Sequence, residues 1–561
     1  MSEYILDHET GVHIRPDKKG IGYADGGEQK LLQILSSVDD RSTFSEELLP
    51  HMSDWPTEYH LSRKRHLILR SLKIKPGDRV LELGCGCGAI TRYLLEAGAQ
   101  VTAVEGELAR AAVAAKRCEG FDTVQFIADD FLNLELDNAY DWVLMIGVLE
   151  YSQKYGKSAD RQAEYLNIAR RHLASEGTLV IAIENKLGIK YLNGAGEDHN
   201  GKLHYGPHDL YEDNDITTWG RQEIRDILVA NGFAYQHFSG VFPDYKLPKI
   251  IVDETIDCHR DFRAEELLHY CRSLDYRGMN ERFFDESLLA GSLRKNGLLI
   301  DMANSFLITA KISATPPENQ SRLAVCYEVD RKSDFCTETQ FFLKNRETVV
   351  LKRKLKTADS RLPHLAFVTT AEGALIKVEH DVDTRTLPYH QGQLMGQAFT
   401  KAIQRDQLHQ AGEHIHNWLA YLVAHFRFYS RTTGRQLPFN KIKGRELSNL
   451  LIDGESLDFG PQNIVTSPQP EAFDLEWKAA SPIPLAWQLT RNCQHVLRTG
   501  YGGKTPINLT QLVGLTADYL GIVAITEDVE EGLYIENQFQ GAVGYVEPAN
   551  HIKLASFSQV N

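Results

Sequence analysis

Residues 79–105 read Arg-Val-Leu-Glu-Leu-Gly-Cys-Gly-Cys-Gly-Ala-Ile-Thr-Arg-Tyr-Leu-Leu-Glu-Ala-Gly-Ala-Gln-Val-Thr-Ala-Val-Glu. An apolar strand runs into three alternating glycines, then a helix, then a second apolar strand that ends on Glu105. The glycines are Gly84, Gly86 and Gly88. Glycines there allow a sharp turn and let a ligand approach the main chain closely. An acid about twenty residues further on lies where a doubly wound sheet binds ribose hydroxyls. The stretch therefore predicts an α/β, Rossmann-like doubly wound sheet.

The glycine spacing argues against a dinucleotide site. Glu82 stands two residues before Gly84, and the stretch lacks the G-x-G-x-x-G spacing that cradles a pyrophosphate. By itself the motif is also compatible with a simple tight turn between a strand and a helix.

Two later segments extend the same sheet. Residues 124–128 form a third predicted strand that ends in Asp129 and Asp130. Residues 140–146 form a buried fourth strand with Gly147 at its carboxyl end. Ligands of open parallel sheets bind beyond the carboxyl ends of the strands. The acids and Gly147 are therefore candidates for the same pocket.

In this order the elements resemble the motifs of class I S-adenosylmethionine-dependent methyltransferases. The resemblance implies that Gly84 and Gly86 lie against the methionine part of the cofactor and that Glu105 holds both ribose hydroxyls. It also implies that Asp129, with Asp130 as the second choice, accepts a hydrogen bond from the adenine amino group. The remaining candidates for the cofactor site are Glu82, Gly88 and Gly147.

Composition excludes several classes of protein. The chain has 561 residues, 42% of them hydrophobic, and a net charge of −15, which disfavours a nucleic-acid-binding surface. Its basic run, residues 351–356, alternates within a strand-like segment. No run of eighteen apolar residues predicts a transmembrane segment, and the opening Met-Ser-Glu-Tyr is no basic leader. Eight scattered cysteines predict reduced thiols in a cytoplasmic protein.

The predicted organisation has four parts. Residues 1–70 form an N-terminal cap, which either covers the mouth of the pocket or packs as an arm. Residues 71–255 form the methyltransferase domain, with a fifth strand over 178–185 after a turn at 174–177. Residues 256–313 form a helical connection. Residues 314–561 form an α+β domain that begins with the linker Ala314-Thr-Pro-Pro-Glu-Asn-Gln-Ser321.

A long polar loop, residues 186–211, follows the fifth strand and carries three histidines. Loops of this length in compact domains are usually functional or disordered. His199 suits the role of general base for methyl transfer to a hydroxyl, because its unperturbed pKa is near 6.5. Asp198 or Glu197 could orient it. Two alternatives stay open: a metal held by Asp198, His199 and Glu150, and transfer by proximity without a strong base.

Several of these segments are similar to bacterial methyltransferases of surface-polysaccharide (O-antigen type) gene clusters. The similarity covers residues 54–250 and rests on Glu184-Asn185, Glu197-Asp198-His199 and Pro243-Asp-Tyr-Lys246. It implies O-methylation of a sugar hydroxyl, or of a phosphate on a sugar, in surface-glycan assembly. A glycan-assembly complex is then the expected partner.

Strand-like runs followed by a helical block over residues 391–428 predict the α+β domain. Within it, Asp458 is followed five residues later by Asn463, and Asp474-Leu-Glu476 follows a short hairpin. Kinases arrange a catalytic base and magnesium ligands in this way. Asp458 would be the base, Asn463 and Asp474 would hold Mg²⁺, and Lys352 would contact the phosphates of ATP. The Asp474-Leu-Glu476 sequence resembles that of small-molecule kinases of the aminoglycoside and choline type.

The domain also departs from kinases. No His or Gly-Asp precedes Asp458, and no glycine-rich loop occurs near residues 330–346. A kinase-like domain that transfers no phosphate fits equally, and Asp458 and Asn463 could simply pin a turn. The prediction is therefore a methyltransferase joined to a kinase-like half. Its alternative is a small-molecule or peptide methyltransferase whose C-terminal half recruits substrate or serves as a scaffold.

Overall fold

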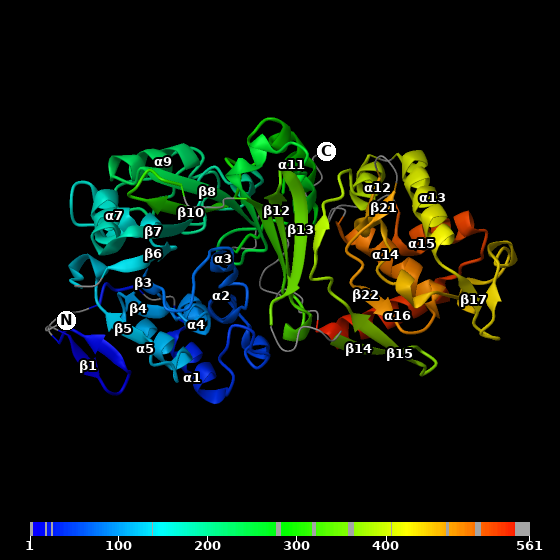
Figure 1. The fold of residues 1–561 in the computed structure, drawn as a ribbon, viewed down its shortest axis with the longest axis horizontal. Coiled ribbons are helices and arrows are strands. Elements are labelled where there is room, and N and C mark those ends of the chain that lie inside the picture. The colour runs from blue at the N-terminus through cyan, green and yellow to red at the C-terminus, as the bar shows by residue number, and fades with distance from the viewer. Residues whose placement is uncertain are drawn as a thin grey trace.

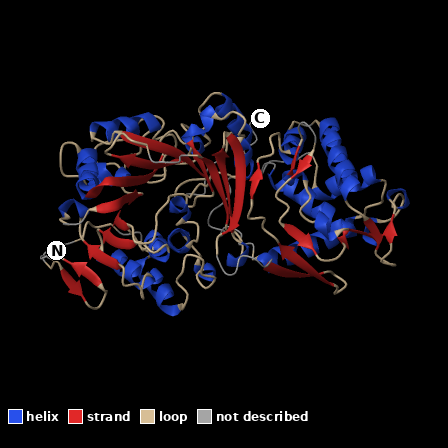
Figure 2. Ribbon diagram, in the orientation of Figure 1, coloured by secondary structure: helices blue, strands red, loops and turns tan. Residues whose placement is uncertain are grey.

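The computed structural model of the chain describes residues 4–544, with gaps at 17–19, 24–25, 137–138, 277–281, 317–320, 357–363, 406, 467–469 and 500–506. Strands run through one end and the middle of the molecule, and helices predominate at the other end (Figures 1 and 2). Among the described helices, none has both the length and the apolar content needed to cross a bilayer.

One sheet of 14 strands organises the N-terminal two thirds of the chain. Its order is β1-β2-β5-β4-β3-β6-β7-β10-β8-β9-β11-β12-β13-β16. The strands are β1 (Ile5–Asp7), β2 (Val12–Ile14), β3 (Arg79–Leu83), β4 (Gln100–Glu105), β5 (Val124–Ala128), β6 (Tyr140–Ile146), β7 (Leu173–Glu184), β8 (Tyr235–Phe242), β9 (Ile250–Asp253), β10 (Ser305–Lys311), β11 (Arg322–Glu328), β12 (Thr337–Lys344), β13 (Glu347–Lys354) and β16 (Thr386–Pro388).

The strands β5, β4, β3, β6 and β7 pair in parallel, which confirms the predicted Rossmann-like sheet. β3 begins the winding, and the chain proceeds from it in one direction to β4 and β5 and in the other to β6 and β7. The carboxyl end of β3 is therefore the topological switch point, where such sheets bind ligands. Both faces of β3 are buried from Val80 to Leu83, including the acid Glu82.

Helices complete this part of the chain. They are α1 (Glu28–Ser37), α2 (Trp55–Leu61), α3 (Leu67–Arg70), α4 (Ala89–Glu96), α5 (Leu108–Arg117), α6 (Ser152–Tyr155), α7 (Arg161–His172), α8 (Ile189–Leu192), α9 (Arg221–Ala230), α10 (Ala264–Leu267) and α11 (Glu286–Lys295). The apolar positions of α4, α5 and α7 are buried in the cores on the two faces of the sheet.

Two predictions about this region are wrong. The predicted helical connection, residues 256–313, contains β10, which lies antiparallel between β7 and β8 in the middle of the sheet. The strand is seven residues long, too short for its periodicity to distinguish a strand from a buried helix. The turn predicted at residues 174–177 is instead part of β7, and the register against β6 shifts there.

The sheet continues across the linker predicted at residues 314–321, of which 317–320 lie outside the described residues. β11 pairs antiparallel with β9, with Val325 opposite Ile251. β12, β13 and β16 then extend the sheet toward the C-terminal part. The proposed division of the chain at this linker stays a prediction.

The C-terminal part has the predicted order of strands and then helices. Its helices are α12 (Met395–Gln404), α13 (Leu408–His425), α14 (Leu485–Thr499), α15 (Leu509–Leu520) and α16 (Thr526–Val543). Its remaining strands are β14 (His364–Thr369), β15 (Leu375–His380), β17 (Phe428–Ser430), β18 (Gln436–Leu437), β19 (Leu450–Ile452), β20 (Ile464–Val465), β21 (Glu471–Ala472), β22 (Trp477–Ala479) and β23 (Ile483–Pro484). A separate hydrophobic core holds these elements together.

Candidate functional site

The turn from β3 to α4 is built on three glycines in the left-handed region. Gly84, Gly86 and Gly88 have φ values of 75°, 55° and 77°. A Cβ on Gly84 would lie 2.7 Å from Cγ2 of Val148, and one on Gly88 would lie 2.8 Å from Cα of Ala114. Side chains are therefore excluded at both positions, because Val148 and α5 pack directly against the main chain of the turn.

Glu105 lies across this turn at the end of β4. One of its carboxylate oxygens accepts a hydrogen bond from the Gly86 N–H at 2.8 Å, and Arg110 Nε lies 3.7 Å from the other. Burial raises the pKa of Glu105, while Arg110 and the Gly86 N–H oppose the rise. Glu82, in β3, accepts a hydrogen bond from the Thr91 hydroxyl at 2.6 Å, and burial raises its pKa to about 8.

The two acids after β5 have different partners. Asp129 accepts a hydrogen bond from the Tyr4 hydroxyl at 2.8 Å and pairs with Arg15 Nε at 3.1 Å. Asp130 accepts the backbone N–H of Leu132 at 3.0 Å and pairs with Lys157 at 2.5 Å. The sequence did not identify Tyr4 and Arg15, because they belong to a short N-terminal hairpin far from the motif.

The N-terminal cap lies over the same edge of the sheet. The Gly22 and Tyr23 N–H groups both donate to Glu107, two residues after Glu105. The Tyr23 ring contacts the Tyr151 ring edge-on at 5.6 Å between centroids. These contacts are compatible with both predicted roles of the cap, as a cover of the pocket or as a packing arm.

Beyond β6 and β7 lies a group that we name the buried ionic cluster: Glu184, Lys190, Asp198, Asp244 and Lys246. Lys246 Nζ donates to Glu184 and, at 2.6 Å, to Asp198. Lys190 Nζ donates to both oxygens of Asp198 at 3.0 Å and lies 3.7 Å from Asp244. The long polar loop thus folds back onto the end of the sheet, and a small pocket lined in part by Lys190, Asn193 and Arg282 adjoins the cluster.

Burial and charge act against each other in this cluster. Burial alone would raise the pKa of Asp198, but Lys190 and Lys246 outweigh it and hold that pKa well below its usual range. Burial would also raise the pKa of Glu184, but Lys246 and His199 outweigh burial and lower that pKa. At Glu150, burial and the negative charge of Glu184 act together and raise the pKa well above its usual range.

His199 lies beside Glu184, an acid that the sequence did not assign to it. Its Nε2 is 3.9 Å from a Glu184 oxygen, and its ring meets that of Tyr151 edge-on. Asp198 is occupied by the two lysines, and Glu197 instead accepts the backbone N–H groups of His199 and Asn200. Whether Asp198 or Glu197 orients the imidazole stays a prediction, since Asp198 also pairs with both lysines and Glu197 also accepts two backbone N–H groups.

The residues that could hold a metal differ from the predicted set, because Glu184 takes the place of Asp198. Among the described residues, Glu150, Glu184 and His199 bring ligand atoms within 4.8 Å of one another, and Asp198 is not part of this group. Lys246 already supplies a positive charge to Glu184. Proton chemistry therefore needs no further cation at this position.

The candidate residues of the C-terminal half also meet. Lys352, on β13, is 2.6 Å from Asp474 and 2.6 Å from Glu476. Arg331, from the loop between β11 and β12, also pairs with Glu476 at 2.7 Å. Lys352 and Arg331 hold the pKa of Glu476 well below its usual range, although burial opposes them.

Asp458 and Asn463 occupy the loop that leads into the β20–β21 hairpin. Asn463 Nδ2 donates to the Asp458 carbonyl at 2.9 Å and approaches the Asp474 carbonyl at 3.5 Å. Asp458 accepts the Glu476 N–H at 3.1 Å, and burial raises its pKa to about 6 although Arg491 opposes the rise.

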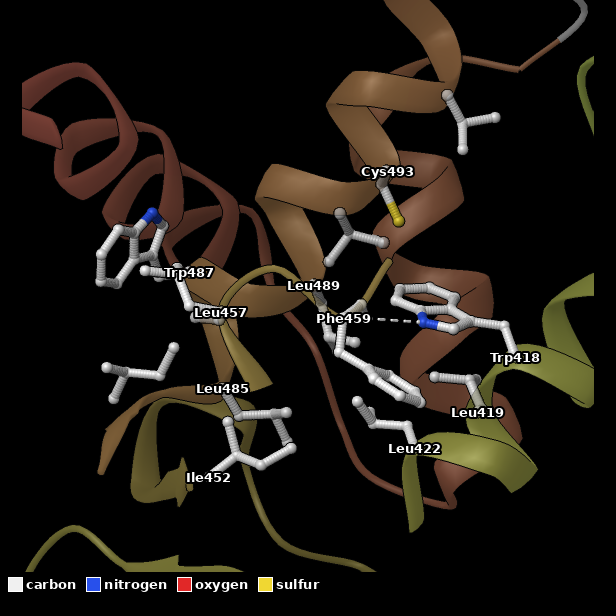
Figure 3. Packing of buried hydrophobic residues seen from close by; sticks show 14 of the residues in the cluster. Trp418, Leu419, Leu422, Ile452, Leu457, Phe459, Leu485, Trp487, Leu489 and Cys493 are labelled. Carbon is white, nitrogen blue, oxygen red and sulfur yellow. Dashed lines mark hydrogen bonds between the residues drawn. The ribbon is translucent and has the colours of Figure 1, made fainter. Parts of the chain in front are cut away.

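The buried neighbours of Asp458 hold this loop in place (Figure 3). Leu457 and Phe459 are both buried in the C-terminal core. Trp418 Nε1 donates to the Phe459 carbonyl at 3.2 Å. The structure thus brings Lys352 together with Asp458, Asn463 and Asp474, which follow it by more than 100 residues in the sequence. Sequence reasoning missed Arg331 and Arg491, which no motif marks.

Comparison with known proteins gives a partial match. Residues 80–177 match the family described as "Methyltransferase domain". Cyclopropane-fatty-acyl-phospholipid synthase of Escherichia coli (strain K12) is 29% identical over 21% of this chain and 29% of its own length. Ribosomal RNA small subunit methyltransferase A of Chlorobaculum tepidum is 31% identical over 23% of this chain and 45% of its own. The chain spans less than half the length of these relatives.

Solved structures cover the same part of the chain. Phosphoethanolamine N-methyltransferase 2 of Haemonchus contortus is 18% identical, with a TM-score of 0.27 over 44% of this chain and 52% of its own. The N-methyltransferase NodS of Bradyrhizobium japonicum is 19% identical in complex with S-adenosyl-L-homocysteine, with a TM-score of 0.23 over 37% of this chain and 86% of its own.

Proposed function

We propose that this chain, whose residues 80–177 match a class I S-adenosylmethionine-dependent methyltransferase domain, is a cytosolic enzyme that methylates an acceptor hydroxyl. The hydrogen bond from the Gly86 N–H to Glu105 carries the proposal. It places a buried acid and the glycine turn together at the switch point of the sheet, where such sheets bind ligands.

The residues present fit the cofactor. S-adenosylmethionine supplies an electrophilic methyl group on a sulfonium. Glu105 would bind the ribose hydroxyls, and Gly84 and Gly86 would line the methionine part, since a Cβ on Gly84 would collide with Val148. Asp129 would accept the hydrogen bond from the adenine amino group, with Asp130 as the second choice; both acids have partners within the chain.

His199 is the proposed general base. As the acceptor oxygen bonds to the methyl carbon, the sulfur–carbon bond breaks and the hydroxyl proton passes to the imidazole. Burial lowers the pKa of His199, so the ring is neutral and able to accept a proton near neutral pH. Glu184 would then stabilise the imidazolium that forms.

The charge of the site favours a hydroxyl over a phosphate as the acceptor. The buried ionic cluster contains three carboxylates and two lysines, and Glu150 lies beside it. Both lysines are already paired with carboxylates. A doubly charged phosphate would meet this surplus of negative charge in a poorly solvated pocket, which is unfavourable.

The class of acceptor is inferred from the sequence motifs. The matched relatives are named for fatty-acyl phospholipid and ribosomal RNA substrates, which leaves the acceptor of this chain open. The motifs of residues 184–246 favour a sugar hydroxyl in bacterial surface-glycan assembly. A small-molecule or peptide acceptor, with the C-terminal half as a recruiting module, is the alternative.

Calorimetric titration of the full chain with S-adenosylhomocysteine tests the cofactor site. Glu105→Ala should weaken binding at least about tenfold, because charge-assisted hydrogen bonds to the ribose are lost. Glu119→Ala, at an exposed acid paired with Lys116, is the control and should bind like the wild type. Equal affinity in all three proteins would place the cofactor elsewhere.

A second function is favoured by the C-terminal geometry. We propose that residues 314–561 bind ATP and Mg²⁺ and transfer phosphate to a hydroxyl, with Asp458 as the base. Asn463 and Asp474 offer oxygen ligands of the kind that Mg²⁺ prefers, and the β20–β21 hairpin lies between them. Lys352 would contact the phosphates of ATP. The observation that favours this reading is the 2.6 Å pair of Lys352 with Asp474.

Binding and turnover of ATP test this proposal. The full chain should bind ATP in the presence of Mg²⁺, and Asp458→Asn should retain binding while losing at least about 100-fold in phosphate transfer. Asp381→Asn, an exposed acid paired with Lys478, is the control. If the wild type does not bind ATP, the C-terminal half is a recruiting or scaffold module.

A further inference from the structure

A basic segment stands out in this acidic chain. Residues 427–446 contain six arginines and lysines and a single acid, Glu446, whereas the whole chain carries a net charge of −15. The segment includes β17 and β18 and lies at the end of the molecule far from β1 (Figure 1). None of its side chains belongs to either proposed active site.

The cations of this segment differ in their partners. Arg431 pairs with Glu531 at 2.7 Å and is part of the fold. Lys441 and Lys443 are exposed on either side of the buried Ile442. Among the described residues, no carboxylate lies within the 4 Å of an ion pair from either lysine. Lys443 Nζ lies 5.9 Å from the centroid of the Phe439 ring, itself 36% exposed.

An apolar strip lies directly beside these lysines. The Gly444 N–H donates to the Gly521 carbonyl at 2.7 Å, and the Val523 N–H donates to the Arg445 carbonyl at 2.8 Å. Val523 and Ile525, which follow α15, are 51% and 52% exposed. We name residues 439–445 and 521–525 together the basic tip.

We propose that the basic tip binds the surface of an anionic lipid bilayer. Lysines next to exposed branched apolar side chains suit the interface, where the ammonium groups meet acidic headgroups and the apolar groups enter the acyl boundary. The attraction between exposed charges extends over about one Debye length, or about 10 Å at 0.1 M salt, so it acts locally at the tip.

The observations favour a bilayer over a nucleic acid. Val523 and Ile525 offer nothing to a phosphate backbone, and the segment has no exposed row of aromatic side chains on which bases could stack. Glu446 and Glu527 flank the tip and are exposed, so the attraction is limited to a small area. The proposal is independent of both proposed activities.

The chain contains a matched control for the lysines. Lys73-Ile74-Lys75 repeats the pattern Lys441-Ile442-Lys443, and its lysines are also exposed. Lys441→Glu/Lys443→Glu and Lys73→Glu/Lys75→Glu therefore change the net charge equally and alter the same kinds of residue.

Flotation with vesicles tests the proposal. The full chain should float with vesicles of phosphatidylcholine and phosphatidylglycerol at 3:1 in 0.1 M salt, and not with phosphatidylcholine alone. Reversal of Lys441 and Lys443 should reduce the bound fraction at least about tenfold, and reversal of Lys73 and Lys75 less than about threefold. Val523→Ser/Ile525→Ser should also reduce binding, while S-adenosylhomocysteine titration and circular dichroism verify the fold of each variant.

Three results would overturn the proposal. They are no binding of the wild type to anionic vesicles, an equal loss in both lysine pairs, and loss only in the control pair. A single-stranded oligonucleotide that binds the wild type, and not the Lys441→Glu/Lys443→Glu variant, while vesicles do not bind would assign the tip to nucleic acid instead.

Discussion

His199 illustrates how burial prepares a side chain for proton transfer. Its imidazole is largely removed from water, faces the carboxylate of Glu184, and has the ammonium groups of Lys246 and Lys190 nearby. Burial is the largest influence and lowers its pKa, and the carboxylates of Glu184 and Asp198 only partly oppose this. A neutral ring beside a fixed negative charge can accept a proton and hold the resulting cation.

The pH dependence of methyl transfer follows from this direction. Activity requires neutral His199, so kcat/KM should stay level from about pH 8 to about pH 6.5, the ordinary histidine value, and fall only at lower pH. His199→Asn should lower kcat by about 100-fold and remove the acidic limb. His208→Asn, an exposed histidine of the same loop, is the control. An unchanged pH profile in His199→Asn would favour transfer by proximity alone.

At this scale the sequence predicts which residues carry chemistry better than it predicts their partners. Residue type and position after a strand select Glu105, His199 and Asp458 as candidates, and their roles stay predictions. The pairing of His199 with Glu184, and of Lys352 with Asp474, depends on how the loop and the hairpin fold back. No local pattern contains that information, which is why Glu184 was not identified as a neighbour of the imidazole.

The turn between β3 and α4 is the element on which the cofactor site depends. Gly88 starts α4 in the left-handed region, and α5 packs so closely that its backbone at Ala114 would meet a Cβ at 2.8 Å. The flexible end of a side chain could move aside, but helix backbone cannot. The turn and α5 therefore constrain each other.

Gly88→Ala should lower the free energy of unfolding by about 1–3 kcal/mol, because it adds strain at positive φ and displaces α5. Chemical denaturation followed by circular dichroism measures the change. Gly291→Ala, inside α11 with nothing within 4 Å of the added Cβ, is the control. It should be neutral or stabilising by up to about 1 kcal/mol. Equal stability of Gly88→Ala and the wild type would contradict the close packing.

Elements were predicted well where periodicity or glycine spacing is strong. The strands β3 to β6, the runs that became β11 to β13, and the helical block of α12 and α13 all appear. β10 was missed because a short apolar run has no period to identify it. The bulge within β7 was mistaken for a turn, because Ser175-Glu-Gly177 has the composition of one.

For the whole molecule, the shared sheet is the main determinant of behaviour. β9 and β11 pair across the predicted linker, and Arg63 from the cap donates to the carbonyl of Arg331. Arg331 in turn pairs with Glu476 beside Lys352. The N-terminal part of the chain therefore contacts the C-terminal part directly.

Cleavage at a protease site placed in residues 314–321 should leave the two fragments associated. They should elute together in size-exclusion chromatography at the position of the intact chain, because the β9–β11 pairing and the cores around it do not depend on the linker. The uncut protein is the control. Separation into two peaks without denaturant would show that the halves are independent units.

Because one sheet joins the two halves, we expect them to unfold together. Strands paired in one sheet tend to melt as a cooperative unit, and a single heat-absorption peak is then expected where two independent domains would give two. Heat damage that opened β9 or β11 would inactivate both ends of the chain together. A cell that makes this protein would accordingly lose or keep both capacities at once, with one shared half-life.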